Sequence, residues 1–446
     1  MSFPIITTAP GKVILSGEHS AVYGKEVIAS AVKNLRCYML VEDLVQECDK
    51  ENNESNFIEL SFPDLHLDQK WNIKEDLGII LDEKTLFSSI AEAPTAFNTK
   101  LSDLIESEVL AKDVSSTAEK TGFSDYHYSA KMVFLYLFLH IAPNIKNKKF
   151  TLKSNVPVGA GLGSSASVSV CLVLAFLYCI NGNKKIDDLE LVNSLSLLGE
   201  KCVHGTPSGI DNAVATYGKA IRLTTSNYNT ENQVKKLSIV ENFPDSLSML
   251  LVNTKIPKST KTLVANVREL YNADSKYMDD VLNCMHRCSV RMIDNFEKIK
   301  KLEALDLQAN TKENSEEYKE ELSRLFNNIR MNHGFLVTLG VSHPGLEKIK
   351  ILSDELKVGG TKLTGAGGGG CAMTILDPLN KKEANLTEFI KTLQDGLGYD
   401  VYKTQLGGVG AFLIPKEAIS QDLAKAFLVE QKLSLKTVTL LNAMLP

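Results

Sequence analysis

No apolar run in this 446-residue sequence is long enough to form a membrane-spanning helix. The longest run covers residues 168–180, whereas a helix needs about 20 apolar residues to cross a bilayer. The first eight residues, MSFPIITT, carry neither a basic segment nor an apolar core, so we expect no secretory signal peptide. These absences predict a cytoplasmic protein that is not embedded in a membrane.

An excess of positive charge is also missing. The chain has 49 lysines and arginines against 54 aspartates and glutamates, which gives a formal net charge of -5. Because general nucleic-acid-binding proteins carry a basic surface, we expect no nucleic-acid partner. The short basic cluster of Lys146, Lys148 and Lys149 is typical of a solvated turn before a strand.

Cysteines at metal-ligand spacing are absent as well. The eight cysteines are scattered along the chain, and no Cys-x-x-Cys pair occurs among them. Structural zinc sites depend on such closely spaced ligands, so we expect none here. Most of these cysteines stand in apolar contexts, which predicts reduced, buried thiols.

Glycine, in contrast, is concentrated in two dense runs. The first covers residues 157–166 and reads PVGAGLGSSA, and the second contains four consecutive glycines, Gly367 to Gly370. Glycine has no Cβ, so it adopts left-handed backbone conformations and lets amide N–H groups converge on an anion. Two such loops predict close backbone contact with a ligand, and a polyphosphate is the usual one.

The first glycine run stands between a predicted strand and a predicted helix. Residues 150–156 alternate apolar and polar side chains, as a half-buried strand does, and residues 165–180 are typical of an apolar helix. This order directs a helix N-terminus at whatever the loop binds. The run matches neither a Walker A loop nor a Rossmann fingerprint. A tight strand-to-helix turn capped by serine remains the alternative.

Two further segments place ionisable side chains near glycine. In residues 9–20 (APGKVILSGEHS), Lys12 stands at the start of a short predicted strand and Glu18 and His19 follow its end. In residues 199–212 (GEKCVHGTPSGIDN), Glu200 and Asp211 flank a predicted turn. Two carboxylates in this arrangement could serve as a magnesium ligand and a proton acceptor. Taken alone, a lysine at a strand start is usually just exposed, and a carboxylate beside glycine is more often a turn residue. Glu18 and His19 could equally be a surface pair.

The rest of the chain predicts two domains. Residues 27–41 suit a strand and its neighbour, whereas the polar insertion at residues 42–125 predicts loops and exposed helices, partly mobile, that decorate one end of the first domain. Residues 126–141 are typical of a buried helix. Apolar residues at helical spacing from Met278 to Ile299 predict a core helix.

A second, smaller α+β domain is expected towards the C-terminus. Residues 362–376 and 401–414 have the character of strands, and a predicted helix near residues 386–397 lies between them. The basic segment 255–261 (KIPKSTK) precedes this part of the chain and could contact an anion.

Together these motifs resemble the GHMP kinase superfamily, which groups galactokinases, homoserine kinases, mevalonate kinases and phosphomevalonate kinases. The similarity covers residues 9 to about 410, nearly the whole chain. Within the superfamily the chain looks most like the mevalonate kinase family, and its polar insertion resembles that of fungal members. The most specific segments are residues 17–23 (GEHSAVY), 204–217 (HGTPSGIDNAVATY), 342–347 (SHPGLE) and 362–371 (KLTGAGGGGC). Galactokinases are similar at Gly17 to His19 but continue with Thr-Asp-Tyr, where this chain has Ser20-Ala-Val.

The fold that this resemblance implies is α+β with two domains. Residues 1–230 would form an N-terminal ATP and substrate domain with a left-handed βαβ-type phosphate-loop unit. Residues 231–446 would form the C-terminal GHMP kinase domain, which is ferredoxin-like. The active site would lie in the cleft between the two.

The activity that it implies is transfer of the γ-phosphate of ATP to the C5 hydroxyl of (R)-mevalonate in isoprenoid biosynthesis. Asp211 falls on the catalytic aspartate, and Lys12 on the lysine that contacts this aspartate and the reacting hydroxyl. Ser165 and Glu200 fall on the ligands of a Mg²⁺ cofactor. The segment that would bind ATP, besides Lys12, comprises Gly159, Ala160, Gly161, Leu162, Gly163, Ser164, Ser165 and Ala166.

The resemblance also implies where the acceptor binds. Glu18, His19 and Ser20 fall on the substrate-facing segment, and Thr260 matches a threonine near the substrate. The partner of the mevalonate carboxylate stays open, with His19 and the lysines of the 255–261 segment as candidates. Gly367, Gly368 and Gly369 are expected near the site.

Regulation and assembly follow from the same resemblance. Long-chain isoprenoid diphosphates would inhibit by competing with ATP, and a homodimer is expected. Two alternatives remain: a kinase of the same superfamily that acts on another small alcohol, and a non-catalytic sensor of ATP and a metabolite. A sensor need not keep Lys12, Ser165, Glu200 and Asp211 together.

Overall fold

The computed structural model describes residues 4–44, 56–111, 124–157, 159–182, 184, 186–309, 316–380, 383–430 and 432–445. Its strands are β1 (Ile5–Ser16), β2 (Val27–Asp43), β3 (Phe57–Phe62), β4 (Leu67–Asn72), β5 (Lys148–Ser154), β6 (Ala220–Ser226), β7 (Val234–Ile239), β8 (Ser248–Asn253), β9 (Gly359–Leu363), β10 (Cys371–Leu376), β11 (Asp400–Gln405) and β12 (Phe412–Ile414). No helix among the described residues has both the length and the apolar character to cross a membrane.

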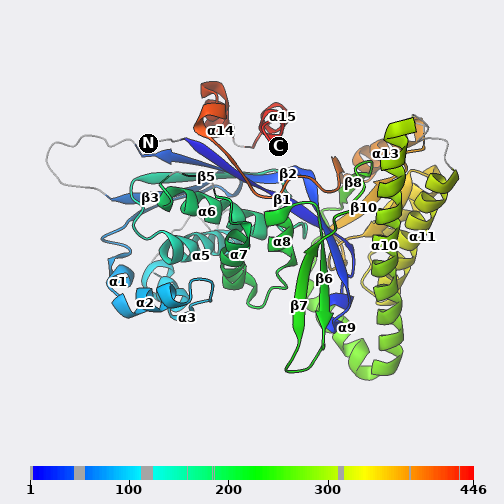
Figure 1. Ribbon diagram of the computed structural model, residues 1–446, viewed down its shortest axis with the longest axis horizontal. Coiled ribbons are helices and arrows are strands. Elements are labelled where there is room, and N and C mark those ends of the chain that lie inside the picture. The colour runs from blue at the N-terminus through cyan, green and yellow to red at the C-terminus, as the bar shows by residue number, and fades with distance from the viewer. Residues whose placement is uncertain are drawn as a thin grey trace.

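Helices of different lengths connect these strands (Figure 1). The α-helices are α1 (Gly78–Leu81), α2 (Lys84–Glu92), α3 (Thr99–Ile105), α5 (Ser124–Ile141), α6 (Ser164–Ile180), α7 (Leu189–His204), α8 (Ile210–Tyr217), α9 (Thr260–Ala273), α10 (Ser275–Ala309), α11 (Glu316–Thr338), α12 (Pro344–Leu356), α13 (Glu383–Lys391), α14 (Gln421–Val429) and α15 (Leu435–Ala443). Short 3-10 turns lie at η1 (Ser20–Tyr23), η2 (Pro63–Leu65) and η6 (Lys416–Ala418), and π-helical turns at η3 (Glu106–Leu110) and η5 (Thr392–Gly396).

The first sheet has the strand order β12-β1-β2-β5-β3-β4, and β6 and β7 form a further arm from β2. The expectation of two neighbouring strands in residues 27–41 is wrong, because β2 is one strand of 17 residues. Its polar break, Lys33 and Asn34, lies in a bulge: β1 pairs Pro10 with Arg36 but Lys12 with Ala31. Four residues of β2 thus lie opposite Gly11. This bulge interrupts the apolar sequence pattern of β2 without ending the strand.

The polar insertion contributes more than a surface decoration. Its strands β3 and β4 extend the first sheet, with β3 parallel to β5, and Trp71 packs in the main core against Phe134 of α5. The expectation of loops and exposed helices is therefore wrong for residues 57–72. The alternation of apolar and polar residues in such short strands is weak. The sequence of this segment alone therefore does not indicate that β3 pairs with β5. The polar stretches 45–55 and 112–123, on which the expectation of mobility rested, lie outside the described residues.

Helices cover both faces of the first sheet. Helices α5, α6 and α7 lie on one face and α14 and α15 on the other (Figure 1). Alternate residues of β2 serve the two layers: Met39 packs in the core shared with α6, and Tyr38 in the cluster shared with α14 and α15. The buried helices predicted at residues 126–141 and 165–180 are confirmed as α5 and α6. Strand β5 was expected to be half-buried, but it is buried almost throughout because helices cover both faces of the sheet.

The second sheet is antiparallel, with the order β11-β8-β10-β9. Taken in chain order its strands read 4-1-3-2, which is the ferredoxin-like arrangement expected from the resemblance. The segment 362–376 is not one strand but the hairpin of β9 and β10, with the second glycine run as its connection. The segment 401–414 is also divided, because β11 belongs to the second sheet and β12 to the first.

The chain therefore forms two α+β units, as predicted, and they meet along β1. Thr364, which follows β9, exchanges two hydrogen bonds with the backbone of Ile14 at 3.1 and 3.0 Å. The hydroxyls of Ser16 and Ser289 lie 2.8 Å apart across the same junction. A domain boundary at residue 230 and the handedness of the phosphate-loop crossover remain proposals. Strands β7 and β12 lie in the first sheet, although both belong to the 231–446 portion of the chain.

Candidate active site

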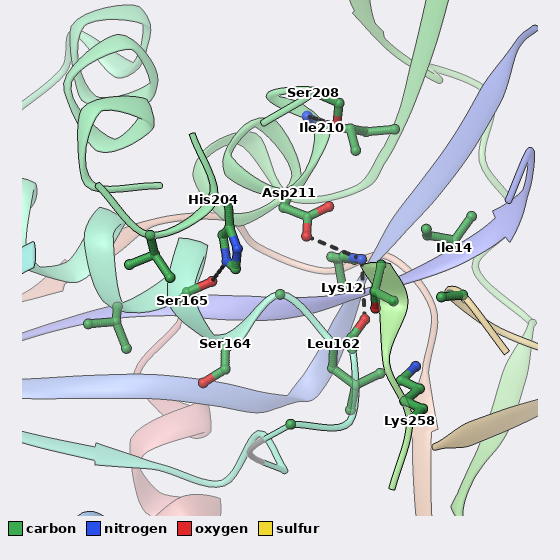
Figure 2. Close-up of a pocket in the computed structure, with 18 of the residues that line it drawn as sticks. Lys12, Ile14, Leu162, Ser164, Ser165, His204, Ser208, Ile210, Asp211 and Lys258 are labelled. Atoms are coloured by element: carbon green, nitrogen blue, oxygen red, sulfur yellow. Dashed lines mark hydrogen bonds and ion pairs between the residues drawn. The ribbon is translucent and has the colours of Figure 1, made fainter. Parts of the chain in front are cut away.

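A cavity of about 830 Å³ lies at the junction of the two units. It is walled by the first glycine loop, the middle of β1, the end of α7 and the start of α8 (Figure 2), and by the start of α9. Its lining includes Lys12, Glu18, His19, Gly159, Gly161, Leu162, Gly163, Ser164, Ser165, His204, Ser208, Asp211, Lys258, Thr260, Gly365 and Ala366. Most of the site residues predicted from the sequence therefore share one cavity.

The first glycine loop has the backbone of an anion-binding turn. Gly159, Gly161 and Gly163 have positive φ angles of 72°, 79° and 70°, and α6 begins at Ser164 directly after the loop. The exposed N–H groups and the dipole of α6 both favour negative charge at this point. A Cβ on Gly163 would lie 2.9 Å from Cγ of Lys12, so the loop's close approach to β1 requires glycine there. Ala160 and Ala166 lie buried behind the loop rather than in the cavity wall.

Lys12 and Asp211 form the polar centre of the cavity. The Nζ atom of Lys12 lies 3.2 Å from Oδ2 of Asp211 and donates to the carbonyl oxygen of Gly161 at 3.2 Å (Figure 2). The expectation that Lys12 stands at the start of a strand is wrong. It lies in the middle of β1 and is buried. Its backbone N–H donates a hydrogen bond to the carbonyl oxygen of Leu162 at 2.8 Å. Asp211 lies in the first turn of α8, with its side chain 31% exposed.

Glu200 lies behind the first glycine loop, on α7, and is buried. Burial raises the pKa of its carboxyl to about 7; Asp211 raises it further, and Ser165 and Lys12 oppose the shift. Its Oε1 atom is buried and has no hydrogen-bond partner among the described residues. The Nε2 atom of His204 lies 3.8 Å from Oε2 of Glu200 and 3.4 Å from Oγ of Ser165. An unpartnered buried carboxylate oxygen marks a position where a cation would be stabilised.

The donors around Glu200 suit a hard cation. A carboxylate and a hydroxyl are oxygen ligands, which Mg²⁺ prefers, and Mg²⁺ is commonly held by one or two carboxylates together with phosphate oxygens and water. The described residues contain no cluster of three His, Cys, Asp or Glu side chains that would form a complete protein cage. Glu200 and Ser165 therefore fit a metal that arrives with a polyphosphate.

Only part of the predicted substrate-facing segment, residues 18–20, lies at the cavity. Glu18 and His19 line the cavity, whereas Ser20 is buried and does not line it. The Nε2 atom of His19 donates to the carbonyl oxygen of Ala366 at 2.8 Å, and burial lowers the pKa of the ring below its ordinary value. A neutral ring in this tautomer leaves Nδ1 as an acceptor. His19 is thus suited to a hydroxyl group and not to a carboxylate.

The four consecutive glycines serve packing within the second unit. Gly365 and Ala366 line the cavity, but Gly367, Gly368 and Gly369 are not among the lining residues. A Cβ on Gly367 would lie 1.9 Å from the carbonyl oxygen of Val341, and one on Gly369 would lie 2.6 Å from that of Ile256. The run lets the β9–β10 connection approach these backbones closely, and this holds Gly365 and Ala366 at the cavity.

Lys258 is the member of the basic segment 255–261 that lines the cavity. A Cβ on Gly161 would lie 2.9 Å from its Nζ atom, so the lysine reaches from the second unit to the first glycine loop. Burial lowers the pKa of Lys258, and the charge of Lys12 adds to the effect. Lys255 instead pairs with Asp400 at 2.8 Å, and Lys261 is exposed. The sequence indicated that the basic segment 255–261 could contact an anion, but it did not indicate which of its lysines would line the cavity.

Two family models match the chain. Residues 127–219 match the model of the GHMP kinase N-terminal domain, and residues 307–393 match that of the GHMP kinase C-terminal domain. The first match contains the first glycine loop, Glu200 and Asp211. The second contains the β9–β10 hairpin with its glycine run.

Relatives match over nearly the whole length. A protein of Saccharomyces cerevisiae named mevalonate kinase is 41% identical over 98% of this chain and 96% of its own length. A Candida albicans protein of the same name is 40% identical over 92% of this chain and 90% of its own length. Among solved structures, that of L. major mevalonate kinase in complex with R-mevalonate has a TM-score of 0.56 at 21% identity, covering 92% of this chain and all of that one. The structural likeness supports the fold, and the sequence identities carry the family.

Proposed function

This chain belongs to the mevalonate kinases of the GHMP kinase family, and we propose that it transfers the γ-phosphate of ATP to the C5 hydroxyl of (R)-mevalonate, giving 5-phosphomevalonate and ADP. The observation that carries this proposal is the Lys12–Asp211 pair at the phosphate loop. A proton acceptor and a cation thus lie beside the place where a γ-phosphate would bind.

Asp211 is the proposed proton acceptor. Phosphoryl transfer depends on in-line positioning and on neutralisation of phosphate charge more than on covalent help from the protein. The acceptor is a primary alcohol, which is a poor nucleophile until its proton has a place to go. Asp211, partly exposed to the cavity, can accept that proton as the transfer proceeds. Lys12 contacts both Asp211 and the loop, so it can hold the carboxylate in position and offset negative charge on the phosphate.

Glu200 and Ser165 are the proposed magnesium ligands, because both supply oxygen donors and Oε1 of Glu200 has no partner among the described residues. Bound with ATP, Mg²⁺ would neutralise part of the triphosphate charge. The N–H groups at the start of α6 would bind the phosphate oxygens directly. Gly159, Gly161 and Gly163 give the loop the backbone shape that this requires.

Lys258 is the proposed partner of the mevalonate carboxylate. It is the cavity-lining lysine of the 255–261 segment, and it stands beside Thr260, which also lines the cavity. His19 is the other candidate, but burial lowers its pKa and leaves the ring without positive charge near neutral pH, and its Nε2 atom already donates to Ala366. A hydroxyl of mevalonate is the better partner for Nδ1 of His19.

Replacing Lys258 by methionine is expected to raise the KM for mevalonate by about tenfold or more, because a charge-assisted hydrogen bond to a carboxylate is lost. The KM for ATP should change far less. Steady-state kinetics with each substrate varied in turn would measure both. Lys261→Met is the matched control, since this lysine lies in the same segment but is exposed. An unchanged KM for mevalonate in Lys258→Met would assign the carboxylate to another group.

Inhibition by isoprenoid diphosphates is a further part of the proposal. The phosphate loop would bind the diphosphate, and apolar side chains of the same cavity, among them Phe62, Val133, Val168 and Val203, offer a wall for the hydrocarbon chain. Farnesyl diphosphate is expected to raise the apparent KM for ATP without lowering the maximal rate. Initial rates over a matrix of ATP and inhibitor concentrations would test this. Inhibition that saturating ATP does not relieve would contradict competition.

We further propose a cytoplasmic location and a homodimer, both from the family resemblance. Two other functions are separable by one assay. ADP release from Mg-ATP would be followed with (R)-mevalonate, galactose, homoserine and phosphomevalonate in parallel. Turnover with another acceptor would make the chain a different kinase of the superfamily. ATP binding without turnover of any acceptor would favour the sensor, although Lys12, Ser165, Glu200 and Asp211 are all present.

A further inference from the structure

A fully buried ion pair joins the two units beside the cavity. Lys362 of β9 contacts Oε1 of Glu18, which follows β1, and the two side chains are 0% and 1% exposed. The partners are 344 positions apart in the sequence. Glu18 also lines the cavity, whereas Lys362 does not. Lys362 thus lies behind a residue of the cavity wall and touches it from the second unit.

The ammonium group of Lys362 is held in a rigid surrounding. Its Nζ atom also donates to the carbonyl oxygen of Leu363 at 2.7 Å. The N–H of Leu363 donates to Nδ1 of His333 at 3.2 Å, and Nε2 of His333 donates to Glu347 at 3.0 Å. The β9–β10 hairpin fixes the backbone, with Lys362 opposite Met373. Lys362 therefore presents its charge from a framework of four secondary-structure elements, β9, β10, α11 and α12.

Glu18 depends on this one cation. Its second oxygen, Oε2, is buried and has no hydrogen-bond partner among the described residues. An unpaired carboxylate in such surroundings is costly, so the conformation of Glu18 is set by where Lys362 holds it. Burial lowers the pKa of Lys362, and Glu18 acts in the opposite direction.

The Lys362–Glu18 ion pair affects more than the side chain of Glu18. The residue after Glu18 is His19, which has a φ of 58° and binds Ala366 of the β9–β10 connection at 2.8 Å. Glu18 and His19 thus both contact the hairpin that carries Lys362, and both line the cavity. A non-glycine residue with positive φ is held there by its contacts, since the conformation is unfavourable in itself.

We propose that Lys362 is a positioning residue for the acceptor side of the site: it holds Glu18, and through Glu18 the neighbouring His19, in the geometry that receives the alcohol substrate. This inference rests on the proposed function for the identity of the acceptor. Lys362 itself touches neither the cavity nor the phosphate loop. Its effect should therefore appear in acceptor binding and leave the nucleotide side unchanged.

The test is a double-mutant cycle of Lys362→Met and Glu18→Gln, with KM measured for mevalonate and for ATP. Lys362→Met is expected to raise the KM for mevalonate by about tenfold or more, since small displacements of positioning groups have large kinetic effects. The KM for ATP should stay within about twofold of the wild-type value. In the Glu18→Gln background, Lys362→Met should add less than about twofold to the KM for mevalonate, because its route of action is already lost.

Lys362→Met leaves a buried carboxylate without its cation and could fail to fold. Lys362→Arg keeps the positive charge, but its longer planar group must displace Glu18 in a fully buried site. It is expected to fold and still to raise the KM for mevalonate. Hydrogen exchange of the amides of residues 18–22 gives a readout that needs no substrate, and it should be faster than in the wild type.

Ser289→Ala is the matched control. Ser289 is buried at the same junction and bonds Ser16, but it does not line the cavity. It should lower thermal stability and leave both KM values unchanged. A folded Lys362→Arg or Lys362→Met with a wild-type KM for mevalonate would overturn the inference, as would effects of Lys362→Met and Glu18→Gln that multiply. Wild-type protein that fails to phosphorylate mevalonate would instead refute the proposed function, and the hydrogen-exchange comparison would still decide the role of Lys362.

Discussion

Asp211→Asn is expected to lower kcat by at least about 100-fold, the lower range for loss of a general base. Asparagine is nearly isosteric with aspartate but cannot accept the proton of the C5 hydroxyl. The KM for ATP should change little, because the phosphate loop and α6 remain in place. The ion pair with Lys12 at 3.2 Å would become at most a hydrogen bond from the lysine ammonium group to an uncharged amide oxygen. Single-turnover kinetics, started by mixing enzyme, Mg-ATP and mevalonate, would isolate the chemical step.

Asp280→Asn serves as the control for this variant. Asp280 is exposed on α10 and does not line the cavity, so its replacement should leave kcat unchanged. If Asp211→Asn kept a kcat within a few-fold of wild type, the proton would have another acceptor. Asp211 would then be a residue that only holds Lys12.

The second large effect is expected at Glu200. Glu200→Gln should raise the Mg²⁺ concentration needed for half-maximal activity by at least about tenfold, since even residues that only support metal ligands cost about that much when replaced. The measurement is activity against free Mg²⁺ at fixed ATP. Glu190→Gln is the matched control, because Glu190 is exposed in the first turn of the same helix. An unchanged titration in Glu200→Gln would make Glu200 a structural residue.

The pH dependence of the magnesium requirement tests the same role. Burial raises the pKa of Glu200 to about 7, so below that pH a growing fraction of the carboxyl is protonated in the absence of metal. Metal binding must then displace a proton. The wild-type protein should therefore need more Mg²⁺ as the pH falls below about 7, and less as it rises above. Glu200→Gln has no proton to displace at this position and should lose that dependence.

The turn of the first glycine loop and the helix after it were predictable because their signal is local. Positive φ angles are indicated by the glycines themselves, Gly159, Gly161 and Gly163. The apolar run after them indicates a buried helix, and neither inference needs the rest of the chain. The core helix α10 was predictable for the same reason. In each case the residues that set the structure are neighbours in sequence.

The centre of the site was reached only through the family resemblance. Lys12 and Asp211 lie far apart in sequence, and each residue alone resembled a surface or turn residue. Their contact depends on how β1 and α8 meet, which no pattern within either segment specifies. The same limit hid the Glu18–Lys362 pair, because its two partners belong to different units.

Some segments gave a local signal that tertiary structure overrode. Lys33 and Asn34 indicated the end of a strand, but the bulge opposite Gly11 carries them within β2. The glycines from Gly367 onward suggested a phosphate loop, whereas they allow close packing against Val341 and Ile256. The same flexibility of glycine is proposed to serve a ligand in the first loop, and it allows backbone packing in the second.

The most direct test of the account is the product balance of the purified protein with Mg-ATP and (R)-mevalonate. Phosphorus NMR would follow ADP and phosphorylated mevalonate in the same sample. Transfer to the C5 hydroxyl in the site of Lys12 and Asp211 predicts one phosphomonoester of mevalonate for each ADP, and almost none of either with Asp211→Asn. ADP formed with free phosphate and no phosphorylated mevalonate, or no ADP at all, would contradict it.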